Sequence, residues 1–214
     1  LKHNPSRAID LIIQQCNDYG LKPWFSEFKI RNRKKIDPLP DDNQILRHCV
    51  VAIAFSQGTQ SRLIAELVET LEFSKAFQHF NIKALARKEP EQLLESHWQD
   101  LSIMRFRSKI DRIIKCAQTL EVLIEEHQTF SQYLKGFSIP RRIVNKTQLN
   151  RFWAGFDKLQ QDLRTRNMPF FKSTTSLLQL LLDLDFDSVK PDLIVMRLAR
   201  RLGIIDRETG DLQL

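Results

Sequence analysis

A carboxylate that follows a proline is the clearest chemical candidate in this 214-residue chain. Asp192 comes directly after Pro191 and before an apolar helical repeat, so we expect it to begin a helix. A carboxylate presented in this way can stabilise a developing positive charge and can orient or deprotonate an attacking water. The alternative is that Asp192 only caps its helix, and the two roles are compatible.

A second group of candidates is the hydroxyl-rich turn before the apolar repeat at residues 177–184. Lys172 is followed there by Ser173, Thr174 and Thr175. Ser173 or Thr174 is a suitable N-cap for the helix that we expect after the turn. Backbone amides at a helix N-terminus bind phosphate without side-chain charge, and a lysine beside them adds a direct phosphate contact. The turn is therefore a candidate phosphate anchor.

Three stretches, in the same order along the chain, resemble the helix-hairpin-helix DNA glycosylases. FSQGT at residues 55–59 is similar to that family's L-S-x-Q-x-T turn, and MRFRSKIDRIIKCA at residues 104–117 resembles its basic turn and helix with the pattern R-x-K-I. Residues 192–203 have the family's spacing D-x-x-V-x-R-x-x-x-R-L-G after the hairpin. The hairpin sequence FKSTT, residues 171–175, is closest to the 3-methyladenine DNA glycosylase I branch. Together these matches cover roughly residues 45–205.

The resemblance implies an all-α, two-lobed fold and an enzyme that removes a damaged base from double-stranded DNA by hydrolysing its N-glycosidic bond. In that family the aspartate matching Asp192 is catalytic, and it also caps its helix. Gln57 matches the residue that fills the gap left by an extruded base, and Gln60 is a second choice for that role. Arg107 belongs to the basic turn and is expected to contact DNA. For Gln57 the alternative is an ordinary exposed turn residue.

The hairpin departs from the family's usual sequence. The family carries G-x-G-x-[KT]-T, whereas residues 170–175 read FFKSTT, so Phe170 and Lys172 stand where the two glycines would be. Bifunctional members carry a nucleophilic lysine at the position of Thr174, so the resemblance predicts a monofunctional enzyme without lyase activity. The lost glycines favour an alternative reading, a catalytically inactive DNA-binding or damage-sensing module of the same fold.

The residues that would form the base pocket are less specific. Trp24, Phe25 and Phe28 lie in an irregular segment, where aromatic rings either stack on an extruded base or fill the junction between two lobes. The 3-methyladenine branch has a pocket glutamate five residues before the turn glycine, and Ile53 occupies that position here. The branch implies an alkylated base as the substrate, and these residues do not identify which one.

The charge of the chain favours an anionic partner. Lysine and arginine number 33 against 26 acidic residues, which gives a net charge of +7 and is typical of proteins that bind nucleic acid. A basic surface without a ligand and an all-α protein scaffold are the alternatives, and a steep loss of affinity with salt would separate them from DNA binding. No apolar run is long enough to span a membrane, and the first residues have no apolar core typical of a signal peptide. We expect a cytoplasmic monomer.

The sequence gives no indication of a metal or cofactor. The chain has three cysteines, which are Cys16, Cys49 and Cys116. They form no C-x-x-C pair and lie in apolar helical contexts, so we expect buried free thiols in a reducing compartment. An iron–sulfur cluster needs four cysteines, and the cysteines and histidines do not reproduce the zinc site of the 3-methyladenine branch. Asp183, Asp185 and Asp187 could suggest a metal site, but we expect this acidic run to be a solvated loop.

Apolar residues recur at intervals of three and four almost throughout, which predicts about ten helices. The expected helices are Pro5–Asp18, Asp42–Ser56, Ser61–Phe77, Ile82–Ala86, Glu91–Trp98, Arg107–Glu126, Phe130–Phe137, Lys146–Leu163 and one on each side of the acidic run. The helix over 146–163 has an apolar stripe that we expect in the core, namely Leu149, Phe152, Trp153, Phe156, Leu159 and Leu163. We expect residues 46–145 to form a central lobe, and residues 1–45 with 146–214 to form the second lobe.

Overall fold

The computed structural model describes Gln14, Asp18 and residues 39–201, apart from the side chain of Ile194. Within these residues every regular element is a helix and no strand occurs, which confirms the all-α class. Gln14 and Asp18 are both helical, while the rest of the helix predicted at Pro5–Asp18 lies outside the described residues.

Ten α-helices are described, and two short 3-10 helices join them. The α-helices are α3 (Asp42–Ala54), α4 (Ser61–Leu67), α5 (Leu71–Ala76), α6 (Ile82–Ala86), α7 (Pro90–Leu101), α8 (Ser108–His127), α9 (Phe130–Lys135), α10 (Lys146–Thr165), α11 (Thr174–Asp183) and α12 (Leu193–Arg201). The 3-10 helices are η1 (Gln78–Phe80) and η2 (Ser102–Met104). Most bounds lie within three residues of those predicted from the apolar periodicity.

The chain divides into two compact units. One unit is residues 38–188, which contains α3 to α11, and the other is residues 1–37 with 189–214, which contains α12. We describe each unit by itself. The lobe boundaries expected near residues 45 and 145 remain a prediction.

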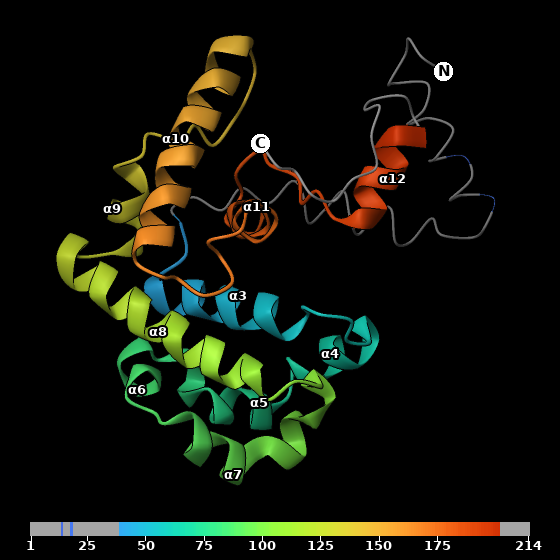
Figure 1. Cartoon of the computed structure of the whole chain (residues 1–214), viewed down its shortest axis with the longest axis vertical. Coiled ribbons are helices and arrows are strands. Elements are labelled where there is room, and N and C mark those ends of the chain that lie inside the picture. Colours follow the sequence, from blue (N-terminus) through green and yellow to red (C-terminus); the bar gives the residue numbers. More distant parts are fainter. Residues whose placement is uncertain (1–13, 15–17, 19–38, 202–214) are drawn as a thin grey trace. The chain divides into compact units, whose positions relative to one another are not determined.

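Helix α3 lies at the centre of the unit of residues 38–188. Its first turn is closed by a capping box, in which Asp41 Oδ1 accepts from the Gln44 amide at 2.8 Å and Gln44 Oε1 accepts from the Asp41 amide at 3.3 Å. The apolar face of α3 is completely buried, and it includes Leu46, Cys49 and Ile53. The helix packs against α8 on one side and against α11 on another (Figure 1). The core of this unit is therefore built around α3.

The single helix predicted over residues 61–77 is wrong, because the chain breaks it after Leu67. The hydroxyl of Thr70 donates to the carbonyl of Leu67 at 2.7 Å and accepts from the amide of Phe73 at 3.2 Å. This side chain thus ends α4 and caps α5, an alternative to helix continuation that threonine offers to the backbone.

The apolar stripe of α10 is only partly in the core. Phe152, Phe156, Leu159 and Leu163 are buried as expected. Leu149 and Trp153 are about 40% exposed, so the prediction that they are buried is wrong. Their positions lie at the edge of a helical stripe, where apolar spacing alone does not separate a buried side chain from one at the rim.

Helix α12 belongs to the unit that contains residues 189–214. Asp192 begins it as predicted: its Oδ1 accepts from the Val195 amide at 2.9 Å, and its backbone carbonyl accepts from the Met196 amide at 2.8 Å. Gly203, the last residue of the motif at residues 192–203, lies outside the described residues. Over residues 39–201, no helix has the length and apolar character that crossing a bilayer requires.

Candidate nucleic-acid interface

The turn between α3 and α4 contains two consecutive residues in the left-handed conformation. Gln57 and Gly58 both have left-handed φ angles, 60° and 69°. Both residues are exposed, so the turn presents the Gln57 side chain to solvent. Glycine adopts this conformation without steric cost, and Gly58 is the glycine of the FSQGT motif.

Hydroxyl groups within the turn bond to the carbonyls at the end of α3. Ser56 Oγ donates to the Ile53 carbonyl at 2.7 Å. Thr59 Oγ1 lies 3.1 Å from the Phe55 carbonyl oxygen and 3.4 Å from that of Ala54. The last carbonyls of a helix have no partner within the helix, so these side chains satisfy groups that the end of α3 leaves open.

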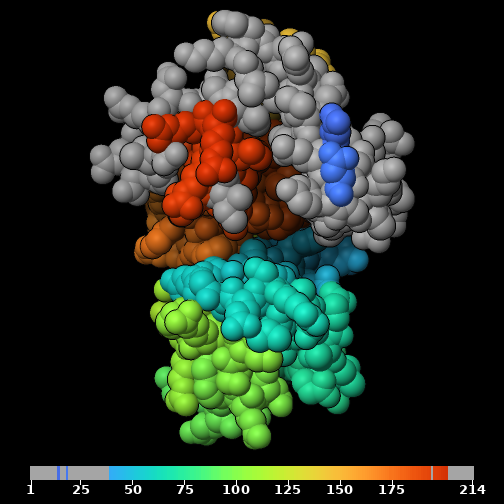
Figure 2. Space-filling model, turned by 90° about the vertical axis from the view of Figure 1, so that its right-hand side faces the viewer, coloured from blue at the N-terminus to red at the C-terminus, as the bar shows by residue number. Residues whose placement is uncertain are grey.

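Side chains of the basic segment that carries the R-x-K-I pattern donate hydrogen bonds to carbonyls of this turn. Lys109 Nζ donates to the carbonyls of Ala54 at 2.9 Å and Ser56 at 2.6 Å, and Arg105 Nη1 donates to the carbonyl of Gly58 at 3.1 Å. Two motifs that are about fifty residues apart in sequence therefore meet in one place. Figure 2 shows the cyan residues around this turn and α4 on the face in view, with green residues of the α7–α8 region beside them.

Lys109 is a buried cation. Its side chain has no exposed surface, and burial together with the charge of Arg112 lowers its pKa to about 8. The sequence placed Lys109 in the R-x-K-I pattern but did not predict that it is buried. Its position at the C-terminal end of α3 places a positive charge where the helix dipole is negative.

Apolar and basic side chains surround the turn. Phe55, Leu63, Ile103 and Phe106 are each between 36% and 40% exposed, and α4 packs against η2. The Arg105 guanidinium lies 5.5 Å from the centre of the Phe106 ring, and that of Arg107 lies 5.4 Å from the Trp98 ring. Exposed aromatic rings interleaved with arginines suit contact with bases and phosphates together.

The hairpin between α10 and α11 is anchored at both ends. Arg166, at the end of α10, pairs with Asp162 and with Glu126 of α8, each at 2.7 Å. At the other end Ser173 caps α11 by accepting from the Ser176 amide at 3.3 Å, as predicted. Thr174 accepts from Gln160 at 3.0 Å. The start of α11 is therefore fixed against α10.

The phosphate-anchor residues lie at the first turn of α11. Thr174 and Thr175 are its first two residues, and amides in those positions have no acceptor within their helix. Lys172 is exposed immediately before the cap, and its carbonyl accepts from the Arg164 guanidinium at 3.2 Å. The structure thus brings Lys172 and these amides together at one helix N-terminus. Whether they bind DNA stays a prediction.

The hairpin keeps a left-handed residue where its family carries the first glycine. Phe170 has φ 66°, and Asn167 earlier in the hairpin has φ 55°. Lys172, at the place of the second glycine, does not have a positive φ. The Phe170 ring packs against the core and meets the buried Phe171 ring edge-on, with centres 5.0 Å apart. Packing of the ring therefore offsets a backbone conformation that costs a non-glycine residue about 1–2 kcal/mol.

Replacing Phe170 tests this strain. Both Phe170→Gly and Phe170→Ala remove the ring, and only glycine tolerates φ 66°, so we expect the glycine variant to be more stable by about 1 kcal/mol. Urea unfolding of both variants measures the difference. At Lys172, whose φ is not positive, the order should reverse, with alanine more stable than glycine. If glycine and alanine variants had the same order of stability at both positions, Phe170 would not be strained.

The structure describes three of the remaining site residues. Asp192 is partly exposed and caps α12 in the other unit. Trp24, Phe25 and Phe28 lie outside the described residues. Ile53 is fully buried in the core beside the turn. Gln60 is exposed and occupies the N-cap position of α4, where its side chain forms no capping hydrogen bond.

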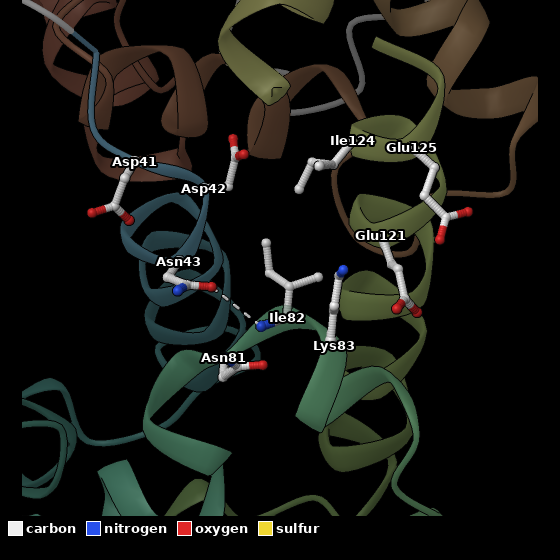
Figure 3. Close-up of a pocket in the computed structure, with 9 residues that line it drawn as sticks. All are labelled: Asp41, Asp42, Asn43, Asn81, Ile82, Lys83, Glu121, Ile124 and Glu125. Atoms are coloured by element: carbon white, nitrogen blue, oxygen red, sulfur yellow. Dashed lines mark hydrogen bonds between the residues drawn. The ribbon is translucent and has the colours of Figure 1, made fainter. Parts of the chain in front are cut away.

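A hollow of about 540 Å³ lies at the opposite end of α3 from the turn (Figure 3). Its walls come from the first residues of α3 and α6 and from the later part of α8. Four carboxylates line it, those of Asp41, Asp42, Glu121 and Glu125, against the single cation Lys83. Carboxylates repel phosphate, so this hollow does not suit DNA.

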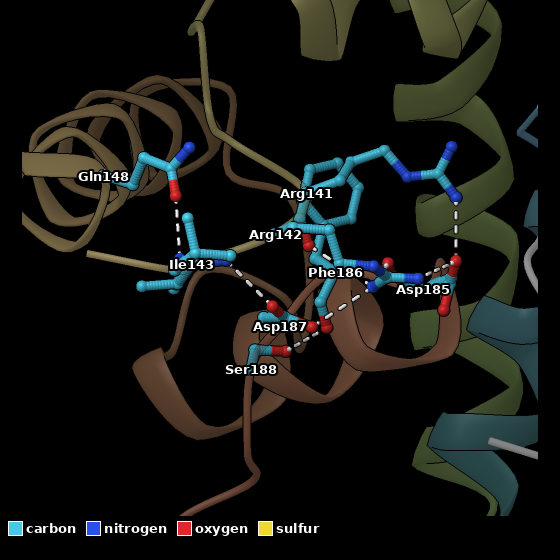
Figure 4. Close-up of polar contacts among 9 residues, drawn as sticks. Arg141, Arg142, Ile143, Gln148, Asp185, Phe186, Asp187 and Ser188 are labelled. Atoms are coloured by element: carbon cyan, nitrogen blue, oxygen red, sulfur yellow. Dashed lines mark hydrogen bonds and ion pairs between the residues drawn. The ribbon is translucent and has the colours of Figure 1, made fainter. Parts of the chain in front are cut away.

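Asp185, in the acidic run at the end of α11, is ion-paired and mostly buried, so the expectation of a solvated loop is wrong for this residue, whereas Asp187 is exposed. Asp185 Oδ2 lies 2.7 Å from Arg142 and 3.1 Å from Arg141 (Figure 4). Asp187 pairs with Arg142 at 3.1 Å and accepts from the amide of Ile143 at 2.8 Å. The two carboxylates raise the pKa of Arg142. These contacts fix the loop before α10 against the residues that follow α11.

No group of three histidine, cysteine, aspartate or glutamate side chains is arranged to hold a metal in the part of the chain that the structure describes. Cys49 and Cys116 are buried free thiols as predicted, and Cys16 lies outside that part. Burial raises the pKa of Cys49 well above its usual value, which disfavours the reactive thiolate.

Comparison with known proteins identifies the family. The sequence model of the methyladenine glycosylase family matches residues 38–180, which is more than half of the chain. The match includes the turn, the R-x-K-I segment and the hairpin, and it ends before Asp192. No curated protein and no solved structure matches the chain significantly. The family match covers two of the three motifs and the hairpin, and the helices of the described residues agree with the all-α fold that the resemblance implies. The chain belongs to the methyladenine glycosylase family, which is a family of DNA glycosylases.

Proposed function

We propose that the protein is a monofunctional DNA glycosylase that hydrolyses the N-glycosidic bond of an alkylated base in double-stranded DNA. The observation that carries this proposal is the hairpin, because its backbone keeps a left-handed residue and a capped helix N-terminus although both family glycines are absent. We further expect a monomer in the cytoplasm.

The DNA contacts in this proposal fall into two groups. The amides at the start of α11, with Ser173, Thr174 and Thr175 around them and Lys172 beside them, hold phosphate and set the position of the duplex. Gln57 fills the gap left by the extruded base, with Gln60 next to it at the start of α4, and Arg107 adds a cation near the same turn.

Asp192 is the catalytic residue in this proposal. As the glycosidic bond breaks, its electrons leave with the base and positive charge develops on the sugar, where a carboxylate stabilises it. A water oxygen then bonds to the sugar carbon, and Asp192 takes up the proton that the water loses. Among the described residues, the hydrogen bond to the Val195 amide uses Oδ1 and leaves Oδ2 for this work.

A DNA-binding module without catalysis is the second candidate. Two observations favour it: the family match ends before Asp192, and the apolar Ile53, which stands in place of the pocket glutamate, is fully buried. The module would bind damaged duplex and release no base.

A panel of duplexes that each contain one modified base tests the proposal and identifies the substrate. We expect abasic sites to form on duplexes with an alkylated purine and not on the unmodified duplex. Tight binding to the same duplexes without abasic sites would favour the second candidate.

No lyase activity should accompany base removal. Thr174 stands where bifunctional members carry the lysine that forms a Schiff base with the exposed sugar, and a hydroxyl cannot form that adduct. Borohydride added during the reaction should therefore trap no protein on DNA. A trapped adduct that disappears in Lys172→Ala would contradict the expectation and would assign the nucleophile to Lys172.

A further inference from the structure

Lys109 is a charged side chain in a place where packing alone would favour an apolar one. It has no exposed surface, and among residues 39–201 no carboxylate forms an ion pair with it. Its Nζ donates instead to the carbonyls of Ala54 and Ser56. Burying an ammonium group is unfavourable unless hydrogen bonds replace its water, so these two bonds keep the lysine in place. The hydrogen bonds of Lys109 therefore indicate that it stabilises the turn after α3.

The backbone carbonyls on either side of Gln57 both accept hydrogen bonds from cationic side chains of residues 105–109. Ser56 O, before Gln57, accepts from Lys109, and Gly58 O, after it, accepts from Arg105. Gln57 itself has a left-handed φ of 60°, a conformation that a free non-glycine residue seldom adopts. The turn would relax towards commoner conformations if these carbonyls were released.

We propose that Arg105 and Lys109 are positioning residues that hold the turn in the conformation in which Gln57 enters the DNA gap. The inference rests on the proposed role of Gln57. A turn that is already rigid loses little conformational freedom on insertion, so more of the contact energy appears as affinity. The two cations act through Gln57 and not by touching the base.

The test uses two duplexes of the same sequence, one intact and one with a tetrahydrofuran abasic analogue, which offers a gap and cannot be excised. Lys109→Met keeps the length of the side chain and removes both hydrogen bonds. We expect it to weaken binding to the abasic duplex by about tenfold, because preorganisation is lost, and binding to the intact duplex by less than about twofold. Lys115→Met is the matched control on α8, since the Lys115 side chain is exposed and pairs with Asp111 of the same helix. It should leave the ratio of the two affinities unchanged.

A double-mutant cycle with Gln57→Ala separates positioning from direct contact. Gln57→Ala alone should reduce the preference for the abasic duplex, and adding Lys109→Met to it should then reduce that preference little further. Full additivity, or equal loss on both duplexes, would overturn the inference and leave the proposed function standing. If Gln57→Ala does not change the preference, the proposed insertion role of Gln57 is itself wrong.

Arg105→Met gives the same cycle if Lys109→Met does not fold. Arg105 is exposed, so its removal does not threaten the core, and it holds the other carbonyl beside Gln57. We expect about a threefold loss of the preference for the abasic duplex, smaller because one bond is removed instead of two, and no further loss in the Gln57→Ala background. An equal loss on intact and abasic duplex would show that Arg105 contacts phosphate directly, which would contradict its positioning role.

Discussion

Asp192→Asn should lower the rate of base excision at least a hundredfold. Asparagine keeps the shape of the side chain and caps a helix about as well as aspartate, so only the charge is lost. If that charge stabilises the sugar cation, its removal costs at least about 2.7 kcal/mol in the transition state. Single-turnover excision on the substrate found in the duplex panel measures the effect. The melting temperature should change little.

Two further variants separate catalysis from capping. Asp192→Ala removes the bond to the Val195 amide and should destabilise the protein by about 1 kcal/mol, besides abolishing excision. Asp157→Asn removes one exposed negative charge from α10 and should leave excision unchanged. If Asp192→Asn excises as fast as the parent, Asp192 only caps α12 and the proposed mechanism is wrong.

Gly155→Ala should destabilise the protein by about 1–3 kcal/mol, although alanine is normally the better helix former. Gly155 is buried within α10, and a Cβ there would lie 2.6 Å from the Phe137 carbonyl oxygen and 2.7 Å from Ile139 Cγ1. Neither distance is tolerated, so the residues before α10 must move. Urea unfolding measures the loss.

Ala154→Gly is the control for Gly155→Ala. Ala154 is the neighbouring residue in α10 and is exposed, so its change to glycine reports helix propensity alone, about 1 kcal/mol. If Gly155→Ala stabilises the protein by a similar amount, the close approach of Phe137 and Ile139 to α10 is wrong.

The helices could be predicted from the sequence because apolar spacing and caps are local signals. Asp192, and either Ser173 or Thr174, were predicted as N-caps; Asp192 and Ser173 accept the capping amide bonds. The break at Thr70 was missed because its hydroxyl bonds compete with helix continuation only once the flanking helices pack. Apolar periodicity runs through this break without interruption.

Site residues that lie within one sequence motif could be predicted, whereas contacts between segments that are distant in sequence could not. Gln57 and Lys172 were found from motifs, and the structure shows both exposed. The bonds of Lys109 to the end of α3 join residues more than fifty positions apart, so no local pattern reveals them. The pairing of Asp185 with Arg141 and Arg142 is a contact of the same kind.

Phe170 shows how a motif can be lost while its geometry is kept. The sequence indicated only that two glycines were missing. The structure shows that the first position still has a left-handed φ and that the second does not need one. Packing of the Phe170 ring against the core replaces the conformational freedom of glycine there.

Release of a free base from DNA is the most direct test of the proposed hydrolysis. Duplex DNA treated with a methylating agent is incubated with an excess of the protein, and the released bases are identified by mass spectrometry. We predict that the wild-type protein releases an alkylated purine such as 3-methyladenine over time, that the DNA strands stay intact, and that Asp192→Asn releases at least about a hundredfold less. Binding of the methylated duplex by the wild-type protein without release of any base would contradict the proposal.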